Sequence, residues 1–338
     1  MPPNPLCVLS KSAGALLLAG VLLIAGCAAS GNGSSAAKNF SAADSPSAPA
    51  AGTTAADTRT VPHLKGESII PAKPGRIASL DYRLTDFLLA LGVKPYASAT
   101  YPGGVMPPYL EASALEGVQP LGDEVNVEAV LNAQPDMILG RKAQADLYDQ
   151  LQAIAPTVIA DSPSKDWKEE LRTYGDMLGR RQQADEWLNS YGKKAEEARA
   201  AIAKAVPEGS TFLYLRIMPK EVRVHGPKQA LSEVLYGDLG LTPAKGVEQL
   251  EDVVPISLEV LPDYDADYIF VEIGAPNAEG DKDAEDNRSQ IERTSVWKNL
   301  KAVRAGHVYE MPQWVISEAP HIKQRSLELV REALVGGK

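Results

Sequence analysis

Apolar residues recur along the chain either at every second position or in short runs, as in strands, or at every third or fourth position, as in helices. The order of these patterns predicts the order of the secondary structure. The segment TVPHLKGESIIPAKPGRIASLD, at 60–81, predicts a small hairpin turning at Gly66, followed by a strand at 76–80. The next stretch, DYRLTDFLLALGVKP, predicts a short helix that Thr85 or Asp86 caps and Gly92 ends. We therefore expect strands and helices to alternate from the start of the globular part.

The same alternation continues with AQPDMILG as a buried strand, AQADLYDQLQAIA as a helix and PTVIA as a third strand. Short apolar runs of this kind, separated by amphipathic stretches, are typical of a mainly parallel sheet with helices packed on it. The first part of the chain thus predicts an α/β lobe.

The longest helical pattern lies between Asp166 and Ala205, and Gly179 divides it. The second piece, at 180–205, would be about 39 Å long at 1.5 Å per residue, enough to bridge two lobes. Trp187, Tyr191 and Ala195 share one face at four-residue spacing, which indicates packing against the rest of the protein.

After Pro207 the strand and helix patterns resume, with STFLYLRI and EVRVHG as strands and QALSEVLYGDLGL as a helix. One segment repeats: NVEAVLNAQPDMIL, from Asn126, aligns without gaps on SLEVLPDYDADYIF, from Ser257. Glu128 then falls on Glu259 at an interval of 131 residues. Each copy reads as a helix start with Asn126 or Ser257 as N-cap, a Glu in the first turn and a buried strand after it.

These patterns predict an α/β fold class, in which two Rossmann-like α/β lobes with mainly parallel sheets are joined by a single long backbone helix. A length of 338 residues with 44% hydrophobic content suffices for two cores. We expect an N-terminal lobe at 61–165, a helical segment containing the inter-lobe helix at 166–206 and a C-terminal lobe at 207–338.

The N-terminus carries a targeting signal. Residues 13–25 form an apolar run that is short for a membrane span, and IAGC leads into Cys27 as in the lipobox of bacterial lipoproteins. We expect a signal peptide at 1–26, lipidation of Cys27 and a tether at 27–60 rich in Ala, Ser, Gly, Thr and Pro. A buried N-terminal helix with an incidental Cys is the alternative.

Charge and cysteine content exclude some classes of function. The formal charge is −10, and removing Lys11 with the signal peptide gives −11, which argues against a nucleic-acid partner because phosphate binding needs a cationic surface. Cys7 is removed with the signal peptide and Cys27 is modified, so that no disulfide is expected.

Metal and catalytic sites find little support. Direct zinc or manganese capture needs about three His with a carboxylate, whereas three of the four His, His225, His307 and His321, fall in the second lobe. The acidic stretch at 281–292 has Asp286 where a calcium loop needs Gly, which favours a solvated surface insertion. A lipoprotein hydrolase is the alternative from a different functional class, but the chain has no G-x-S-x-G or H-E-x-x-H motif.

Seven segments in a fixed order resemble the iron-siderophore (ferric hydroxamate/citrate-type) branch of the substrate-binding lipoproteins of ABC transporters, in the helical-backbone class. They are IPAKPGRIASLD, TDFLLALGVKP, NVEAVLNAQPDMIL, YDQLQAIAPTV, YGDLGL, ISLEVLPDYDADYIF and WKNLKAV. The resemblance implies a ligand cleft between the lobes, a ferric siderophore as ligand rather than a cofactor, and a permease dimer as partner. It also implies a monomer held by its lipid on the extracytoplasmic face of the cell membrane; cobalamin or haem remain alternative ligands.

Proteins of this branch hold ferric chelates with arginines and aromatic surfaces, and this chain offers such residues at strand ends and in the following loops. The candidates are Arg216, Arg83, Arg141, Trp314, Tyr82, Arg223 and His225. Arg216 is the strongest, because it stands in an apolar strand where a charge needs the cleft or a structural acid as partner. Lys142 could replace Arg141, and Trp314 could contact the ligand or belong to the core.

The resemblance also gives the repeated glutamates a role. In related binding proteins one acidic residue of each lobe forms salt bridges with arginines of the permease, and Glu128 and Glu259 stand at the matching places. The alternative is that both carboxylates only stabilise the starts of their helices.

Overall fold

The computed structural model describes residues 57–160, 166–274 and 278–336 of the chain. The expected signal peptide, Cys27 and nearly all of the tether lie outside these ranges. Within them, no helix combines the length and apolar character that crossing a membrane requires.

The described chain begins with the predicted hairpin, formed by β1 (Thr58–His63) and β2 (Gly66–Pro71). Gly66 has a φ of 120°, which favours glycine and allows the tight reversal. The hairpin is fixed to the first sheet by Ser68, whose hydroxyl donates to the carbonyl of Thr157 at 2.7 Å.

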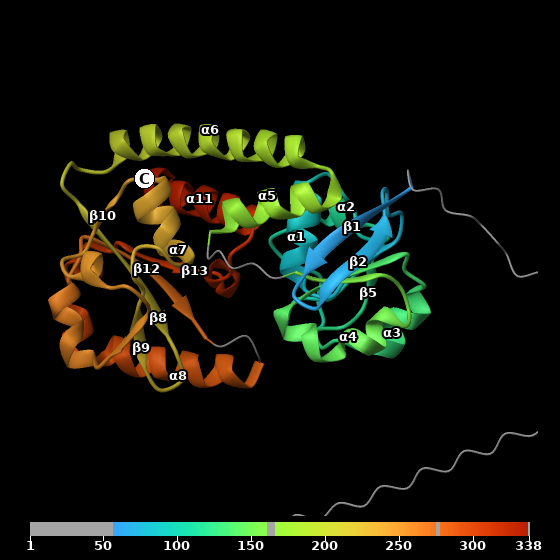
Figure 1. Ribbon diagram of the computed structural model, residues 1–338. Helices are drawn as coiled ribbons and strands as arrows, with labels where there is room; N and C mark the ends of the chain where they lie inside the picture. The colour runs from blue at the N-terminus through green and yellow to red at the C-terminus, as the bar shows by residue number, and fades with distance from the viewer. Residues whose placement is uncertain (1–56, 161–165, 275–277, 337–338) are drawn as a thin grey trace, which may run out of the picture. The chain divides into compact units, whose positions relative to one another are not determined.

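The first sheet has five parallel strands in the order β5-β4-β3-β6-β7, confirming the predicted parallel arrangement (Figure 1). In that order they are Gln119–Pro120, Ala97–Ser98, Ile77–Ser79, Met137–Arg141 and Thr157–Ala160. The helices between them are α1 (Tyr82–Ala90), α2 (Ala112–Leu115), α3 (Val127–Ala133), the 3₁₀ helix η1 (Lys142–Leu147) and α4 (Tyr148–Gln152). Because the strands are parallel, their carboxyl ends share one edge, where Asp81 and Arg141 lie.

The second sheet has the order β11-β9-β8-β12-β13, with β10 (Thr242–Pro243) beside the start of β8. The ordered strands are Val254–Ile256, Val222–Val224, Thr211–Ile217, Tyr268–Ile273 and Val308–Met311. The contacts of β12 with β8 and β13 are parallel, whereas β9 is antiparallel to both β8 and β11. The sheet is therefore mainly parallel with an antiparallel edge. Its helices are α7 (Ala230–Ser232), the π helix η2 (Glu233–Asp238), the 3₁₀ helices η3 (Val247–Gln249) and η4 (Leu258–Tyr264), α8 (Ala278–Arg293), α9 (Ser295–Asn299) and α10 (Lys301–Ala305).

The sequence repeat has a structural counterpart at the start of a central strand in each sheet. Asp136 accepts hydrogen bonds from the backbone N–H groups of Gly75 and Arg76, just before β3. Asp267 accepts from both the backbone N–H and the hydroxyl of Thr211, at the start of β8. The repeated Asp thus accepts hydrogen bonds from backbone N–H groups at or just before the start of a strand.

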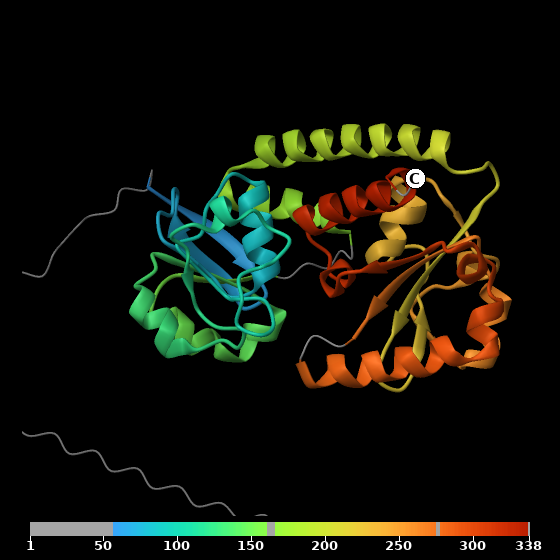
Figure 2. The same ribbon diagram turned by 180° about the vertical axis from the view of Figure 1, so that it is seen from behind.

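The connection between the sheets is the predicted pair of helices, α5 (Trp167–Leu178) and α6 (Arg181–Ala205). Gly179 ends α5 in the left-handed conformation, with a φ of 65°, as expected of a C-terminal glycine. Figures 1 and 2 both show α6 running alongside α5 and α11 (Pro320–Val335). Tyr191 and Ala195 of α6 are buried in this packing, and Trp187 stacks on Tyr191, as predicted.

The hydrophobic core divides according to the two faces of each sheet. On β8, Phe212 and Tyr214 enter a large core shared with α1, α5, α6 and α11, whereas Leu213 and Leu215 enter a separate core. This follows from the alternation of side chains along a strand. Since the large core also takes residues of the first sheet, such as Met137, it links both lobes to the connecting helices.

A second link between the lobes joins α1 to the start of α11. The fully buried Asp86 accepts hydrogen bonds from the backbone N–H and the Nδ1 of His321, at 2.8 and 2.7 Å, and from the N–H of Ile322. Nearby, the hydroxyl groups of Tyr82 and Ser317 lie 2.9 Å apart. A carboxylate from one lobe therefore caps the last helix of the other.

Two predicted helix caps are wrong. The first helix begins earlier than expected, because Asp81 accepts from the N–H of Arg83 and caps it. Thr85 and Asp86 are instead buried inside α1 and serve tertiary contacts. Ser257 does not bond to the backbone N–H groups of the following turn, which is a 3₁₀ helix, whereas Asn126 caps α3 as predicted.

The acidic segment at 281–292 is also different from the expected surface insertion. It lies within α8, which packs on β8 and β12 (Figure 1). Ala284 is fully buried and Ile291 is 5% exposed, so that one face of this highly charged helix belongs to the core. The prediction failed because charged residues dominate this segment, and its two buried apolar positions lie seven residues apart on one helical face.

Replacing Asp86 by Ala should lower the free energy of unfolding by about 3 kcal/mol, because it removes the cap of α11 and leaves the half-buried His321 without its partner. Urea denaturation measures the loss. Asp185→Ala is the control, since this half-exposed carboxylate also meets basic side chains but should contribute at most about 1 kcal/mol. Equal losses in the two variants would contradict the structural role of Asp86.

Candidate functional site

A cavity of about 460 Å³ lies where residues from both lobes meet. Arg141 comes from the end of β6 and Glu170 from α5, whereas most of the wall belongs to the second lobe. The lining residues of the second lobe are Arg216, Arg223, His225, Lys228, Gln229, Ala230, Val253, Ile316 and Glu318. Four of the predicted ligand contacts, Arg141, Arg216, Arg223 and His225, are thus brought together in one cavity.

Each arginine of the cavity has an acidic partner. Arg141 lies 3.3 Å from Glu170, and Arg223 is paired with Glu221. Burial raises the pKa of Glu170, and the nearby Arg141 and a hydrogen bond from Tyr174 oppose that rise. The cations are therefore held in place by ion pairs, yet all three arginines still line the cavity.

Arg216 has the most buried of these pairs. Its Nε lies 3.0 Å from Oε1 of Glu272, directly opposite on β12, but without the geometry of a directed hydrogen bond. The other oxygen of Glu272 accepts a hydrogen bond from the hydroxyl of Tyr214. Burial raises the pKa of Glu272 to about 7, while Arg216 and Tyr214 pull it down. Both alternatives foreseen for Arg216 are realised, since it faces the cavity and meets a structural acid.

His225 lines the cavity with both ring nitrogens lacking a hydrogen-bond partner among the described residues, although it is only 4% exposed. Burial lowers its pKa to about 4, with Arg216 and Arg223 acting in the same direction. The imidazole is therefore neutral at physiological pH and offers one donor and one acceptor.

Three buried polar atoms at the wall of this cavity have no partner among the described residues: Nη1 of Arg141 and both ring nitrogens of His225. The Nε of Arg216 and Oε2 of Glu318 also lack a directed hydrogen bond, but they lie in ion pairs with Glu272 and Lys323. Native proteins pair nearly all such atoms, because an unmade hydrogen bond in a buried place costs about 1–3 kcal/mol. The wall is thus arranged to meet a polar ligand.

The part of the wall that Ala230 and Glu318 form is held by a buried lysine. Lys323 of α11, 1% exposed, donates to the carbonyl of Ala230 at 2.8 Å and pairs with Glu318 and with Glu233. Glu318 in turn accepts from the N–H of Ala230 at 2.7 Å. Ala230 has a φ of 49°, a strained value for a residue with a side chain, which these contacts hold in place.

The predicted contacts Tyr82 and Arg83 line a neighbouring cavity of about 400 Å³ at the carboxyl edge of the first sheet. Arg83 lies there 2.6 Å from Asp81. Trp314 is 8% exposed and packs against Tyr109 of the first lobe, with ring centroids 5.5 Å apart, two residues before the cavity-lining Ile316. Lys142 is exposed and lines neither cavity.

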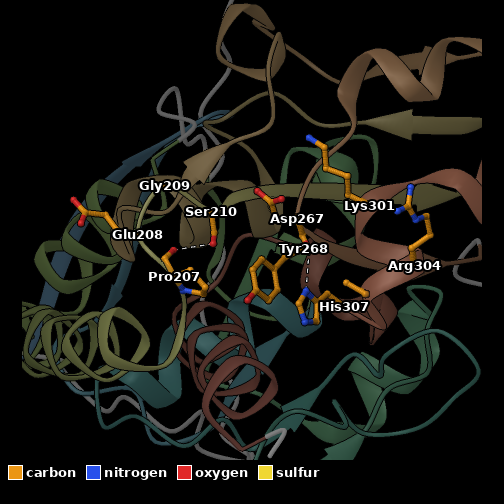
Figure 3. Close-up of a pocket in the computed structure, with 10 residues that line it drawn as sticks. Pro207, Glu208, Gly209, Ser210, Asp267, Tyr268, Lys301, Arg304 and His307 are labelled. Carbon is orange, nitrogen blue, oxygen red and sulfur yellow. Dashed lines mark hydrogen bonds between the residues drawn. The ribbon is translucent and has the colours of Figure 1, made fainter.

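A larger cavity, of about 640 Å³, opens at the amino edge of the second sheet (Figure 3). Asp267 and His307 of this cavity are engaged within the protein. Asp267 bonds to Thr211, and His307 bonds to the carbonyl of Asp267 and stacks on Tyr268 at 4.4 Å. We therefore place the candidate functional site at the cavity of about 460 Å³ that Arg216 and His225 line, where buried groups lack partners. Among the described residues, no three His, Cys, Asp or Glu side chains are grouped to hold a metal ion.

Comparison with known proteins identifies the family. The sequence profile of the periplasmic binding protein family matches residues 77–314. The chain belongs to the periplasmic binding protein family. This family consists of substrate-binding proteins of ABC importers, which is consistent with a cavity between two α/β lobes.

Two relatives of this binding protein are from Bacillus subtilis (strain 168). The chain is 34% identical to the probable siderophore-binding lipoprotein YfiY over 278 residues, 79% of this chain and 84% of the relative. It is 32% identical to the iron(3+)-hydroxamate-binding protein FhuD over 287 residues, 82% of this chain and 87% of the relative.

Solved structures share the fold. A FhuD fold-family protein from Bacillus subtilis, a component of a ferrichrome ABC transporter, superimposes with a TM-score of 0.70 at 29% identity, covering 81% of this chain and 98% of that one. SirA of Staphylococcus aureus in complex with staphyloferrin B gives 0.67 at 25% identity, covering 82% and 98%. The binding protein thus has the two-lobed fold predicted from its sequence.

Several residues of the site were missed by the sequence reasoning. Glu272 stands in the apolar strand segment YIFVEI, where its charge was the available signal. Glu318 and Lys323 come from the segment around α11 and reach the wall through tertiary packing, which no local pattern reveals.

The carboxyl group of Glu272 should titrate near pH 7 in the free binding protein, well above its ordinary value of 4.5. Carbon-13 NMR of glutamate-labelled protein measures the midpoint, with Glu272→Gln assigning the signal. Arg216→Met should raise the midpoint further, because it removes the cation that stabilises the carboxylate. A midpoint near 4.5, or no response to the loss of Arg216, would disprove the burial and pairing described.

Proposed function

We propose that this binding protein captures a ferric siderophore outside the cytoplasm and delivers it to the permease of an ABC importer, without catalysing a reaction. The observation that carries the proposal is the cavity with Arg141, Arg216, Arg223 and the unpartnered His225 on its wall. The named specificities of YfiY and FhuD, and the staphyloferrin B bound to SirA, support a siderophore as the ligand.

The chemistry of the wall suits an oxygen-rich chelate. Ferric siderophores present carboxylate, hydroxamate or catecholate oxygens around the metal, and an arginine fork donates to such oxygens without losing its charge. His225 can donate to or accept from a polar group of the chelate. Arg83, Tyr82 and Trp314 extend the proposed contact surface into the first lobe and along the inter-lobe contact.

Such contacts have to supply a useful affinity. Capture from a dilute medium needs a dissociation constant between about micromolar and nanomolar, which is about −8 to −12 kcal/mol. Charge-assisted hydrogen bonds made in a partly buried cavity, where fixed donors replace ordered water, can reach this range.

Attachment and docking complete the proposal. Cys27, outside the described residues, would carry the lipid that holds a monomer at the membrane. Glu128, in the first turn of α3, and Glu259, in the first turn of η4, are both exposed. We assign them to salt bridges with the two halves of a permease dimer, since each lobe offers one at an equivalent place.

Arg216→Ala should weaken binding of the ferric siderophore tenfold or more, because the variant removes a charged donor from the cavity wall. Quenching of tryptophan fluorescence, titrated with a panel of iron-loaded and iron-free siderophores, identifies the ligand and measures the loss. Thermal denaturation checks that the variant folds.

Arg304→Ala is the matched control, because this exposed arginine lines the larger cavity of Figure 3. Its affinity should equal that of the wild type. A loss confined to Arg304→Ala would move the site to the other cavity. Preferential binding of haem or cobalamin in the same titration would refute the siderophore as ligand.

Glu128→Ala combined with Glu259→Ala should abolish uptake of the iron-loaded siderophore by cells while leaving its affinity unchanged, since both side chains lie outside the cavity. Uptake of radioactive iron measures transport. Glu196→Ala with Glu197→Ala, which removes two exposed charges from α6, serves as control and should transport normally. Normal uptake by the first double variant would show that these glutamates do not dock the permease.

A further inference from the structure

Glu272 contacts Arg216 from inside the protein and, unlike Arg216, does not line the cavity. The two residues are direct neighbours on β12 and β8, with Nε and Oε1 3.0 Å apart. Glu272 is fully buried, whereas Arg216 is 8% exposed and lines the cavity. The guanidinium group is thus shared between a carboxylate inside the protein and whatever occupies the cavity.

The other carboxylates of the cavity have cations of their own. Glu170 pairs with Arg141, and Glu318 pairs with the buried Lys323. A negatively charged chelate that binds at Arg216 therefore competes mainly with Glu272. Glu272 is fully buried, and a buried carboxylate that loses its counter-ion becomes neutral by taking up a proton from solvent.

We propose that binding of an anionic ferric chelate at Arg216 is coupled to the uptake of one proton by Glu272. Arg216 then forms its ion pair with the chelate in place of Glu272, and Glu272 remains as a neutral acid beside Tyr214. This inference rests on the proposed function and adds a residue that sets which charge state of ligand the site accepts.

The surroundings of Glu272 favour this exchange. β8 presents Tyr214 and Arg216 to it, and β13 presents the uncharged Met311 at the opposite position. Beyond Tyr214 lie His225, whose ring is 4.8 Å from the tyrosine ring, and Glu318, which acts on Tyr214 electrostatically. His225 is neutral, so that Arg216 is the cation whose engagement decides the charge of Glu272.

The protonation balance fits physiological pH. Burial already raises the pKa of Glu272 to about 7, with Arg216 holding it from rising further. An anion at Arg216 weakens that restraint and adds a repulsive charge, so that the pKa rises in the complex. Affinity for an anionic chelate should then be constant below about pH 7 and fall by up to about tenfold per pH unit above it.

Ligand charge provides the first test. A ferric tris-catecholate such as ferri-bacillibactin carries negative charge, because each catecholate contributes two charges, whereas the tris-hydroxamate ferrichrome is neutral. Titration calorimetry at pH 8, in two buffers with different ionisation enthalpies, counts the protons taken up. We expect about one proton for the anionic chelate and none for ferrichrome.

Variants provide the second test. Glu272→Gln, which mimics the neutral acid, should bind the anionic chelate without proton uptake and keep its affinity between pH 7 and 9. Glu221→Gln, which alters the more exposed partner of Arg223, should retain the proton uptake of the wild type. If Glu272→Gln does not fold, Arg216→Met takes its place and should also lose the proton uptake.

The outcomes separate the two proposals. Binding of the anionic chelate without proton uptake, or with uptake that persists in Glu272→Gln, would overturn the coupling while leaving the receptor function intact. Binding of ferrichrome alone would also overturn it, since no anion then meets Arg216. Failure of every ferric chelate to bind would overturn the proposed function and the coupling together.

Discussion

Each arginine in the buried cavity wall needs a counter-charge nearby, and this constraint determines which acidic residues lie around the cavity. Arg216 stands in an otherwise apolar strand, and an isolated charge there would be too costly to retain. Glu272 supplies the counter-charge from the adjacent strand, and Tyr214 fixes the carboxylate. The same principle accounts for Glu170 beside Arg141 and for Lys323 beside Glu318. Each pair holds a polar side chain at the wall in the absence of ligand.

A shared hydrophobic core, hydrogen bonds and ring packing hold the two lobes together around that wall. The helices α5 and α6 share a large hydrophobic core with both lobes, and Asp86 adds a hydrogen-bonded cap on α11. Ring packing between Tyr109 and Trp314 and the contact between Tyr82 and Ser317 lie along the same inter-lobe connection.

Much of the fold could be predicted from the sequence because its signals are local. The division of the long helix at Gly179, the hairpin at Gly66 and the capping of α3 by Asn126 each depend on a few adjacent residues. Predictions failed where a residue had two plausible uses. Asp86 looked like a helix cap but serves a helix 235 residues away, and the charges of α8 concealed Ala284 and Ile291. The arginines of the site could be named from their strands, but their partners could not, since pairing is decided by tertiary contacts.

The most direct test of this account is a crystal structure of the protein with an iron-loaded siderophore, phased to show the anomalous signal of iron. The account predicts an iron peak in the cavity between Arg141 and Arg216, with ligand oxygens in hydrogen-bond contact with Arg216 and His225. An iron peak at the larger cavity near Arg304 and His307, or a chelate that leaves Arg216 uncontacted, would contradict it.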